Sequence, residues 1–97
     1  MPRALLRRRF CRCPGLSRFL GIVVAMYYND HSPAHFHAIY GAYEAIVEIE
    51  SGTVTGAFPP RALGHVQEWR ELHKAELLQN WQRARDREPL VKIAPLE

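Results

Sequence analysis

The pair Pro59-Pro60 separates two parts of the chain that have different hydrophobic periods. Before the prolines, apolar residues alternate with polar ones or form short runs, which is typical of strands. After them, apolar residues recur at 3.6-residue spacing, which is typical of an amphipathic helix. The sequence therefore predicts an α+β fold, in which a small antiparallel sheet is followed by one C-terminal helix packed on one of its faces.

Three or four antiparallel strands in a meander are expected before the prolines. The first is apolar on both faces, which indicates an interior strand. Asn29-Asp30 then favours a turn, and Pro33 cannot donate to a sheet ladder, so a loop follows. Gly41-Ala42 has the chemistry of a type II′ hairpin turn, and Ser51-Gly52 marks a second tight turn. The expected strands are residues 21–28, 35–40 and 43–50, with a weaker one over residues 53–58.

One long helix is expected after the prolines. A proline is tolerated in the first helical turn, because its missing N–H would be unpaired there. Nothing breaks the apolar stripe before Pro89, so residues 60–87 are predicted to form one helix, either straight or bent near His73-Lys74. The tail over residues 89–97 is a candidate for a short edge strand. The apolar stripe consists of Leu63, Val66, Trp69, Leu72, His73, Leu77, Trp81 and Ala84.

Positive charge is concentrated at the beginning of the chain. The first twelve residues contain five arginines and no acidic residue, whereas residues 13–97 contain 8 Lys and Arg against 10 Asp and Glu. We therefore expect residues 1–13 to be a disordered basic extension and residues 14–97 to form a single α+β domain. A start codon assigned too early would also explain the presence of this extension. The mildly acidic domain does not favour nucleic acid as its partner, although a basic arm can contact nucleic acid.

The composition also limits the compartment. No apolar run approaches the ~20 residues that a membrane-spanning helix needs, so no membrane partner is expected. Cys11 and Cys13 are the only cysteines, too few for a disulfide framework or a four-ligand zinc site. A reducing cytoplasm is therefore the expected location.

Residues 29–38 contain three of the five histidines together with an aspartate. His35 and His37 project from the same face of an expected strand, and His31 lies four residues before His35, beside Asp30. Asp30, His31, His35 and His37 form a set that Zn²⁺, Fe²⁺ or Mn²⁺ can accept. The three histidines could instead act as catalytic acids and bases in phosphodiester cleavage without a metal. A third interpretation is structural, because loop histidines and aspartates often cap turns.

Other side chains are candidates for binding. Arg18 and Arg61 are cations that could hold a phosphate, and both could equally be surface charges. Trp69 and Trp81 lie at nearly the same azimuth of the expected helix, where they either fill the core or form a ridge that binds a partner. The strand tyrosines could stack on nucleic-acid bases, although strand tyrosines more often pack in the core. The binding candidates are Asn29, Asp30, Tyr40, Arg61, Trp69, His73 and Trp81.

Several motifs resemble one small bacterial family. They recur in the family's order at compatible spacing, and they include Ser-Arg-Phe at 17–19, Gly-Ile-Val-Val at 21–24, Met-Tyr-Tyr-Asn-Asp-His at 26–31, His-Phe-His-Ala at 35–38, Pro-Pro-Arg-Ala-Leu at 59–63, Leu-His at 72–73 and Asn-Trp at 80–81. Over residues 14–96 the chain is similar to the domain-of-unknown-function family numbered 4160. Ala34 departs from the family pattern, which commonly has a second proline there.

The resemblance implies no established activity. Members of this family resemble proteins encoded by small genes that lie beside another short gene, an arrangement suggestive of toxin–antitoxin pairs. The resemblance thus implies a small protein partner encoded nearby, and our leading hypothesis is a cytoplasmic protein-interaction module in such a pair. The alternative is a histidine-centred hydrolase or ribonuclease, metal-dependent or metal-free. The two hypotheses differ in whether Asp30, His31, His35 and His37 converge on an open pocket.

Overall fold

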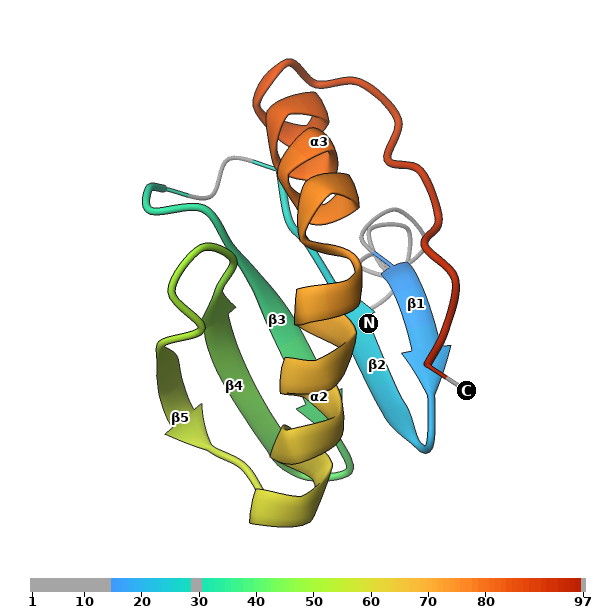
Figure 1. Cartoon of the computed structure of the whole chain (residues 1–97). Coiled ribbons are helices and arrows are strands. Elements are labelled where there is room, and N and C mark those ends of the chain that lie inside the picture. Colours follow the sequence, from blue (N-terminus) through green and yellow to red (C-terminus); the bar gives the residue numbers. More distant parts are fainter. Residues whose placement is uncertain (1–14, 29–30, 97) are drawn as a thin grey trace, which may run out of the picture.

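The computed structural model describes residues 15–28 and 31–96, and Figure 1 shows a sheet covered on one face by two helices. Neighbouring strands are antiparallel, and their order in the sheet follows the chain. The expected extension over residues 1–13 lies outside the described residues. The strands are β1 (Gly15–Phe19), β2 (Ile22–Ala25), β3 (His35–Tyr40), β4 (Tyr43–Glu48) and β5 (Val54–Ala57), and the helices are α2 (Pro60–Leu72) and α3 (Lys74–Arg85).

The α+β class agrees with the prediction. The predicted number of strands, three to four, was wrong, because the sheet has five strands. The extra strand is β1, which precedes the first expected strand and turns back at Leu20-Gly21. Both turn residues have positive φ, 51° for Leu20 and 79° for Gly21, and Phe19 pairs with Ile22 across them. Positive φ at both central residues is the pattern of a type I′ turn. Leucine adopts positive φ at a cost of about 1–2 kcal/mol, so it is not a residue that usually indicates a turn. The apolar run around Leu20 therefore does not reveal the β1–β2 turn.

The central hairpin forms where the sequence predicts it. Strand β3 has the predicted bounds, and β4 begins at the predicted residue but ends at Glu48 instead of Glu50. Tyr40 pairs with Tyr43 across the turn, and Gly41 has a φ of +60°. The positive φ at the first central residue, without one at Ala42, is the pattern of a type II′ turn.

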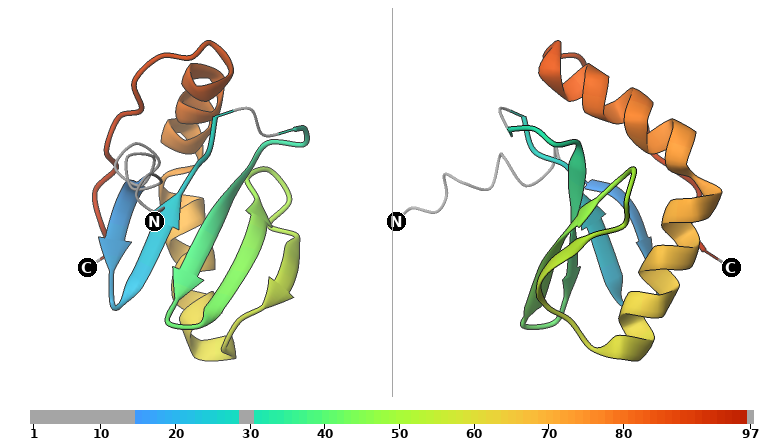
Figure 2. Two further views of the ribbon diagram at one scale, coloured as in Figure 1. Left: turned by 180° about the vertical axis from the view of Figure 1, so that it is seen from behind. Right: turned by 60° about the vertical axis from the view of Figure 1, so that its left-hand side comes forward.

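The prediction of one C-terminal helix was also wrong. The helical segment is divided at His73, whose φ of −121° and ψ of 25° lie outside the helical region. The strands have only four to six residues, so a straight helix over residues 60–87 would extend well beyond the sheet. The break lets α3 lean over the end of the sheet at which β3 begins (Figure 2). Trp69 of α2 and Leu77 and Trp81 of α3 are buried as a result.

The C-terminal segment docks beside β1 without forming a strand (Figure 1). One strand-like hydrogen bond joins the Ile93 N–H to the Leu16 carbonyl, at 3.0 Å. Backbone groups of Val91 and Ala94 bond instead to helix side chains. The Asn80 side chain accepts from the Val91 N–H at 2.7 Å and donates to the Val91 carbonyl at 2.9 Å, and the Trp69 indole donates to the Ala94 carbonyl at 2.9 Å. These bonds replace the sheet ladder that an edge strand would form.

The hydrophobic core lies between the sheet and the helices. Val24, Ala38 and Ala45 share the covered face in register on three neighbouring strands, and Trp69 packs above them with its ring 5.8 Å from that of Phe36. The opposite face of the sheet is not covered by any described element (Figure 2). No helix within the described residues is long and apolar enough to cross a membrane. The largest fully buried side chains are Trp69, Phe36, Leu16, Ile22, Met26, Ile49, Leu77, Val24, Val47 and Val66.

Candidate functional site

His31, His35 and His37, which we name the histidine row, lie together at the beginning of β3. Their rings follow one another, with centroids 5.8 Å apart between His31 and His35 and 5.4 Å apart between His35 and His37. The first lies on the loop before β3, and the other two lie on β3 itself. The structure thus brings together the three predicted catalytic residues. Asn29 and Asp30, which were predicted to bind beside them, lie outside the described residues.

Each ring of the histidine row is oriented by a bond at its Nδ1 atom. Nδ1 of His35 lies 2.8 Å from the Pro33 carbonyl oxygen, and Nδ1 of His31 lies 3.1 Å from the Ser32 carbonyl oxygen. Nδ1 of His37 lies 3.2 Å from Oε2 of Glu44. Carbonyl oxygens only accept, and so does an ionised carboxylate, so Nδ1 carries the proton and donates in each case. The lone pair of each neutral imidazole is therefore on Nε2, the arrangement found in bases and metal ligands that are oriented through Nδ1.

Aromatic side chains from α3 and from the segment after β2 pack against two rings of the histidine row. Trp81 of α3 lies 5.1 Å from the His35 ring, and Tyr27 lies 4.5 Å from the His37 ring at an interplanar angle of 69°. His35 is only 4% exposed as a result, whereas His31 is exposed. Trp81, predicted as a binding residue, thus lies next to the predicted catalytic residues. The buried, hydrogen-bonded His35 also fits the structural interpretation of the cluster.

The three imidazole rings of the histidine row do not by themselves form a metal site. Within residues 15–28 and 31–96, no group of three or more His, Cys, Asp or Glu side chains is placed so that it could hold a metal ion. Asp30, the carboxylate of the predicted set, lies outside those residues. The set of Asp30, His31, His35 and His37 therefore stays a prediction.

The other predicted binding residues divide between the core and the opposite end of the sheet. Trp69 is fully buried, and its ring lies 5.5 Å from that of His73 at the junction of the helices. Nδ1 of His73 lies within hydrogen-bond distance of Oε1 of Glu76, on the first turn of α3. Tyr40 and Arg61 line a pocket at the other end of β3.

That opposite end exposes an apolar surface, which we name the turn end and define as Leu20, Tyr40, Tyr43 and Phe58. Leu20 is 60% exposed, Tyr43 48% and Tyr40 36%. The ring of Tyr40 lies 6.1 Å from that of Phe58, and a Cβ atom on Gly21 would lie 3.2 Å from Tyr40. The β1–β2 turn therefore packs against the β3–β4 hairpin here. Leu20 was not among the predicted binding residues, because its exposure depends on a turn that the apolar run does not show.

A pocket of about 350 Å³ opens at the turn end. Its apolar wall consists of Leu20, Ile22, Tyr40, Pro59 and Ala62, and its polar groups belong to Arg61 and His65. His65 was not among the predicted binding residues. Arg61 and His65 are four residues apart on α2 and therefore lie on one face of it, a signal that the spacing contains once the helix is assigned.

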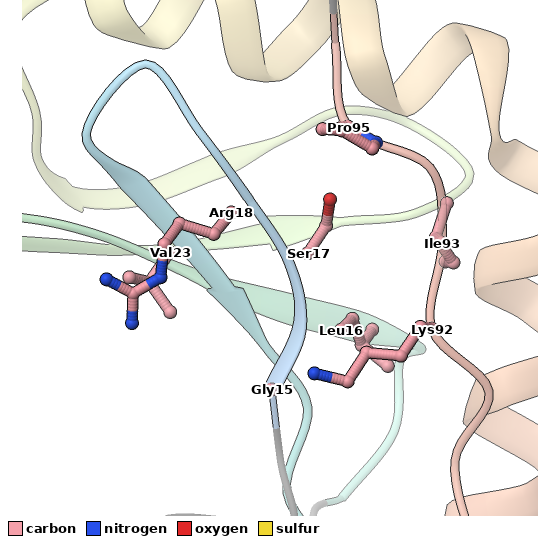
Figure 3. A pocket seen from close by; sticks show the side chains of 8 residues that line it. All are labelled: Gly15, Leu16, Ser17, Arg18, Val23, Lys92, Ile93 and Pro95. Atoms are coloured by element: carbon pink, nitrogen blue, oxygen red, sulfur yellow. The ribbon is translucent and has the colours of Figure 1, made fainter.

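A larger pocket, of about 540 Å³, lies between β1 and the C-terminal segment. Its polar groups include Arg18, Lys92 and the buried Oγ of Ser17, which has no hydrogen-bond partner within the described residues. Figure 3 shows that the Arg18 and Lys92 side chains are well apart and that the Ser17 hydroxyl points away from both. These three groups do not converge, so the pocket lacks the geometry of a phosphate site.

Comparison with known proteins identifies the family. The family model described as "Domain of unknown function (DUF4160)" matches residues 21–82, which is more than half of the chain. The chain belongs to the DUF4160 family. The match includes the histidine row, α2, most of α3, and the residues of the turn end other than Leu20. No curated protein and no solved structure matches the chain.

Proposed function

We propose that this DUF4160 protein is a protein-interaction module that binds its partner through the turn end. The observation that carries the proposal is the exposure of three large apolar side chains on two neighbouring turns: Leu20 at 60%, Tyr43 at 48% and Tyr40 at 36%. Burying apolar surface is the main favourable contribution to protein association. Adjacent exposed apolar side chains on a small domain therefore favour a binding surface.

The composition of the turn end supports a protein partner. Tyrosine and arginine are enriched at the centres of protein interfaces, and they contribute most to binding when a pocket surrounds them. Tyr40 and Arg61 both line the pocket at this end, and Phe58 supports the Tyr40 ring. The neighbouring turns are short, and Gly21 holds the β1–β2 turn close to Tyr40. A partner would therefore meet a surface that needs little ordering on binding.

We further propose that the partner is a small protein encoded nearby, in a pair that resembles a toxin–antitoxin pair. The family resemblance supports this part of the proposal. In such a pair one protein neutralises the other by binding, so the DUF4160 protein needs a specific surface more than a catalytic site.

The proposal is tested by purifying the full chain together with each protein encoded beside it and measuring binding by calorimetry. Leu20→Asn removes the apolar side chain but keeps the turn, because asparagine tolerates positive φ better than leucine does. We expect it to weaken binding by about tenfold, the effect of losing one well-packed apolar contact of about 1–2 kcal/mol. The matched control is Leu72→Asn, since Leu72 is 65% exposed and lies on α2 away from the turn end.

Two results would contradict the proposed function. In the first, no neighbouring gene product binds the wild-type chain. In the second, Leu20→Asn and Leu72→Asn weaken binding equally, which would mean that the partner uses another surface.

The histidine row supports a second candidate function, a hydrolase or ribonuclease. The observation in its favour is that Nδ1 of His31, His35 and His37 each meets an acceptor, which directs every lone pair to Nε2. A neutral imidazole in this form accepts a proton at Nε2, and an imidazolium can return one to a leaving group, as phosphodiester cleavage requires. Glu44 would orient the His37 ring through its Nδ1 atom.

This candidate is tested with a fluorescently labelled single-stranded RNA, in the presence of chelator and then of Mn²⁺ or Zn²⁺. If the candidate is correct, His37→Gln lowers the cleavage rate by at least about a hundredfold, the usual contribution of a general acid or base. His65→Gln is the matched control, because His65 lies at the other end of the sheet. Absence of cleavage by the wild type in all three conditions, or equal rates in both variants, would reject the histidine row as a catalytic site.

A further inference from the structure

The pocket at the turn end combines an apolar wall with the guanidinium of Arg61 and the imidazole of His65. Leu20, Ile22 and Tyr40 form the wall from the sheet, and Pro59 and Ala62 form it from the beginning of α2. Its volume of about 350 Å³ is near the lower limit of the roughly 300–1,000 Å³ that is typical of ligand sites. The pocket is therefore suited to one large side chain rather than to a long segment.

Arg61 and His65 supply the polar part of this pocket. Neither side chain has a hydrogen bond or an ion pair with another of the described residues. Arg61 differs in this respect from Arg70, whose guanidinium bonds to Ile49, Gln67 and Glu71. An arginine beside an apolar pocket is suited to a carboxylate, which its planar group can bind through two parallel hydrogen bonds.

We infer that this pocket receives a large apolar side chain of the partner protein together with a carboxylate next to it in the partner's sequence. The apolar side chain contacts Leu20 and Tyr40, and the carboxylate accepts hydrogen bonds from Arg61, with His65 beside it. The inference rests on the proposed docking at the turn end, and it adds the chemistry of the partner segment. The partner segment is complementary in charge as well as in shape, because the Arg61 guanidinium has no acidic partner of its own in the described part of the chain.

The inference is tested with two peptides that differ only in the carboxylate. The probes are acetyl-Gly-Trp-Glu-Gly-amide and acetyl-Gly-Trp-Gln-Gly-amide, each titrated into the ¹⁵N-labelled full chain and followed by NMR. We expect both to shift the amide signals of Leu20, Ile22 and Ala62, since both carry the apolar side chain. The glutamate peptide should bind about five- to tenfold more tightly, as expected for one charge-assisted hydrogen-bonded contact at a partly exposed site.

Arg61→Gln should abolish the preference for the glutamate peptide while leaving the binding of the glutamine peptide unchanged. Arg85→Gln is the matched control, because Arg85 is an exposed cation on α3. The preference should also decrease with added salt, since salt screens an exposed ion pair. A backbone NMR spectrum that is unchanged away from residue 61 would exclude misfolding as the cause.

Three results would overturn the inference. These are no shifted signals at the pocket with either peptide, equal affinity for both peptides, or a preference that persists in Arg61→Gln. Failure of the inference is distinguishable from failure of the proposed function. If a neighbouring gene product binds through Leu20 but Arg61→Gln has no effect on it, the docking surface stands and the partner chemistry is wrong. If no partner binds at all while the peptide preference holds, the proposed function fails and the pocket stands.

Discussion

At the scale of single residues, the most consequential side chain outside the candidate sites is Arg70. It is a charged residue only 6% exposed, and its guanidinium donates 2.8 Å hydrogen bonds to the Ile49 carbonyl, to Oε1 of Gln67 and to Oε2 of Glu71. Gln67 in turn donates to the Gly52 carbonyl at 2.8 Å. Two α2 side chains thus hold the β4–β5 turn. The apolar stripe does not reveal this role, because arginine is usually exposed.

Arg70→Met is expected to destabilise the protein by about 1–3 kcal/mol. Methionine fills much of the same volume but leaves the buried Ile49 carbonyl without its donor, and an unpaired buried polar group has a cost of this size. In a domain of this length, each kcal/mol lowers the melting temperature by roughly 4–8 °C. Thermal unfolding of Arg70→Met and of the exposed control Arg85→Met measures the difference. Equal melting temperatures for the two variants would show that Arg70 is not required to hold the turn.

At the scale of secondary-structure elements, the C-terminal segment shows how side chains can replace a sheet ladder. Asn80 of α3 forms two hydrogen bonds with the backbone of Val91, and Trp69 of α2 bonds to Ala94. Both donors come from residues that are themselves buried. Ile93 is consequently buried between β1 and the helices, although the segment has no regular secondary structure.

Asn80→Ala is expected to release this segment. The change removes both hydrogen bonds to Val91, so we expect a loss of about 1–3 kcal/mol in the free energy of unfolding and faster hydrogen exchange at the Val91 amide. Gln79→Ala is the control, because Gln79 is exposed and its substitution should change stability by less than about 0.5 kcal/mol. Unchanged exchange at Val91 in Asn80→Ala would show that Leu16 and Trp69 hold the segment without it.

At the scale of the whole molecule, the two candidate sites lie at opposite ends of one strand. Strand β3 begins at His35, in the histidine row, and ends at Tyr40, in the turn end. At about 3.3 Å per residue, the two ends are roughly 16 Å apart. Substitutions at such separated positions usually have additive effects. Variants of the histidine row should therefore leave peptide binding at the turn end unchanged, and the two functional hypotheses can be tested independently.

Metal binding would stabilise the whole fold, so thermal unfolding of the full chain tests it. A ligand that binds only the native state stabilises it by about 2.7 kcal/mol at 100 times its Kd. If Asp30, His31, His35 and His37 bind a metal, the melting temperature of the wild type should rise by several degrees with Zn²⁺, Mn²⁺, Fe²⁺ or Ni²⁺ relative to chelator, and this rise should be absent from the His35→Ala/His37→Ala double variant. Hydrolysis with that metal would then be the activity to measure first. No rise with any of these metals would reject the predicted metal site.

The sequence by itself determined the features that depend on neighbouring residues. The alternation over β4, the glycine at position 41 and Pro60 at the beginning of α2 define the hairpin and the first helix, because strand and helix periods and turn chemistry are local. The clustering of His31, His35 and His37 also follows from their spacing on one loop and one strand. These features were predicted within a few residues.

Only the tertiary structure decided the features in which distant contacts outweigh local preference. Leu20 adopts positive φ because β1 must return beside β2. The sequence allowed either a straight helix or a bend near His73-Lys74, and the need to keep α3 packed over a short sheet decided for a break at His73. The same is true of the pairing of His37 with Glu44, which depends on hairpin register, and of the Asn80 bonds that hold the C-terminal segment. Local periodicity contains no information about such contacts. In each case the unfavourable local conformation or the burial of a polar group is compensated by packing or hydrogen bonds with residues far along the chain.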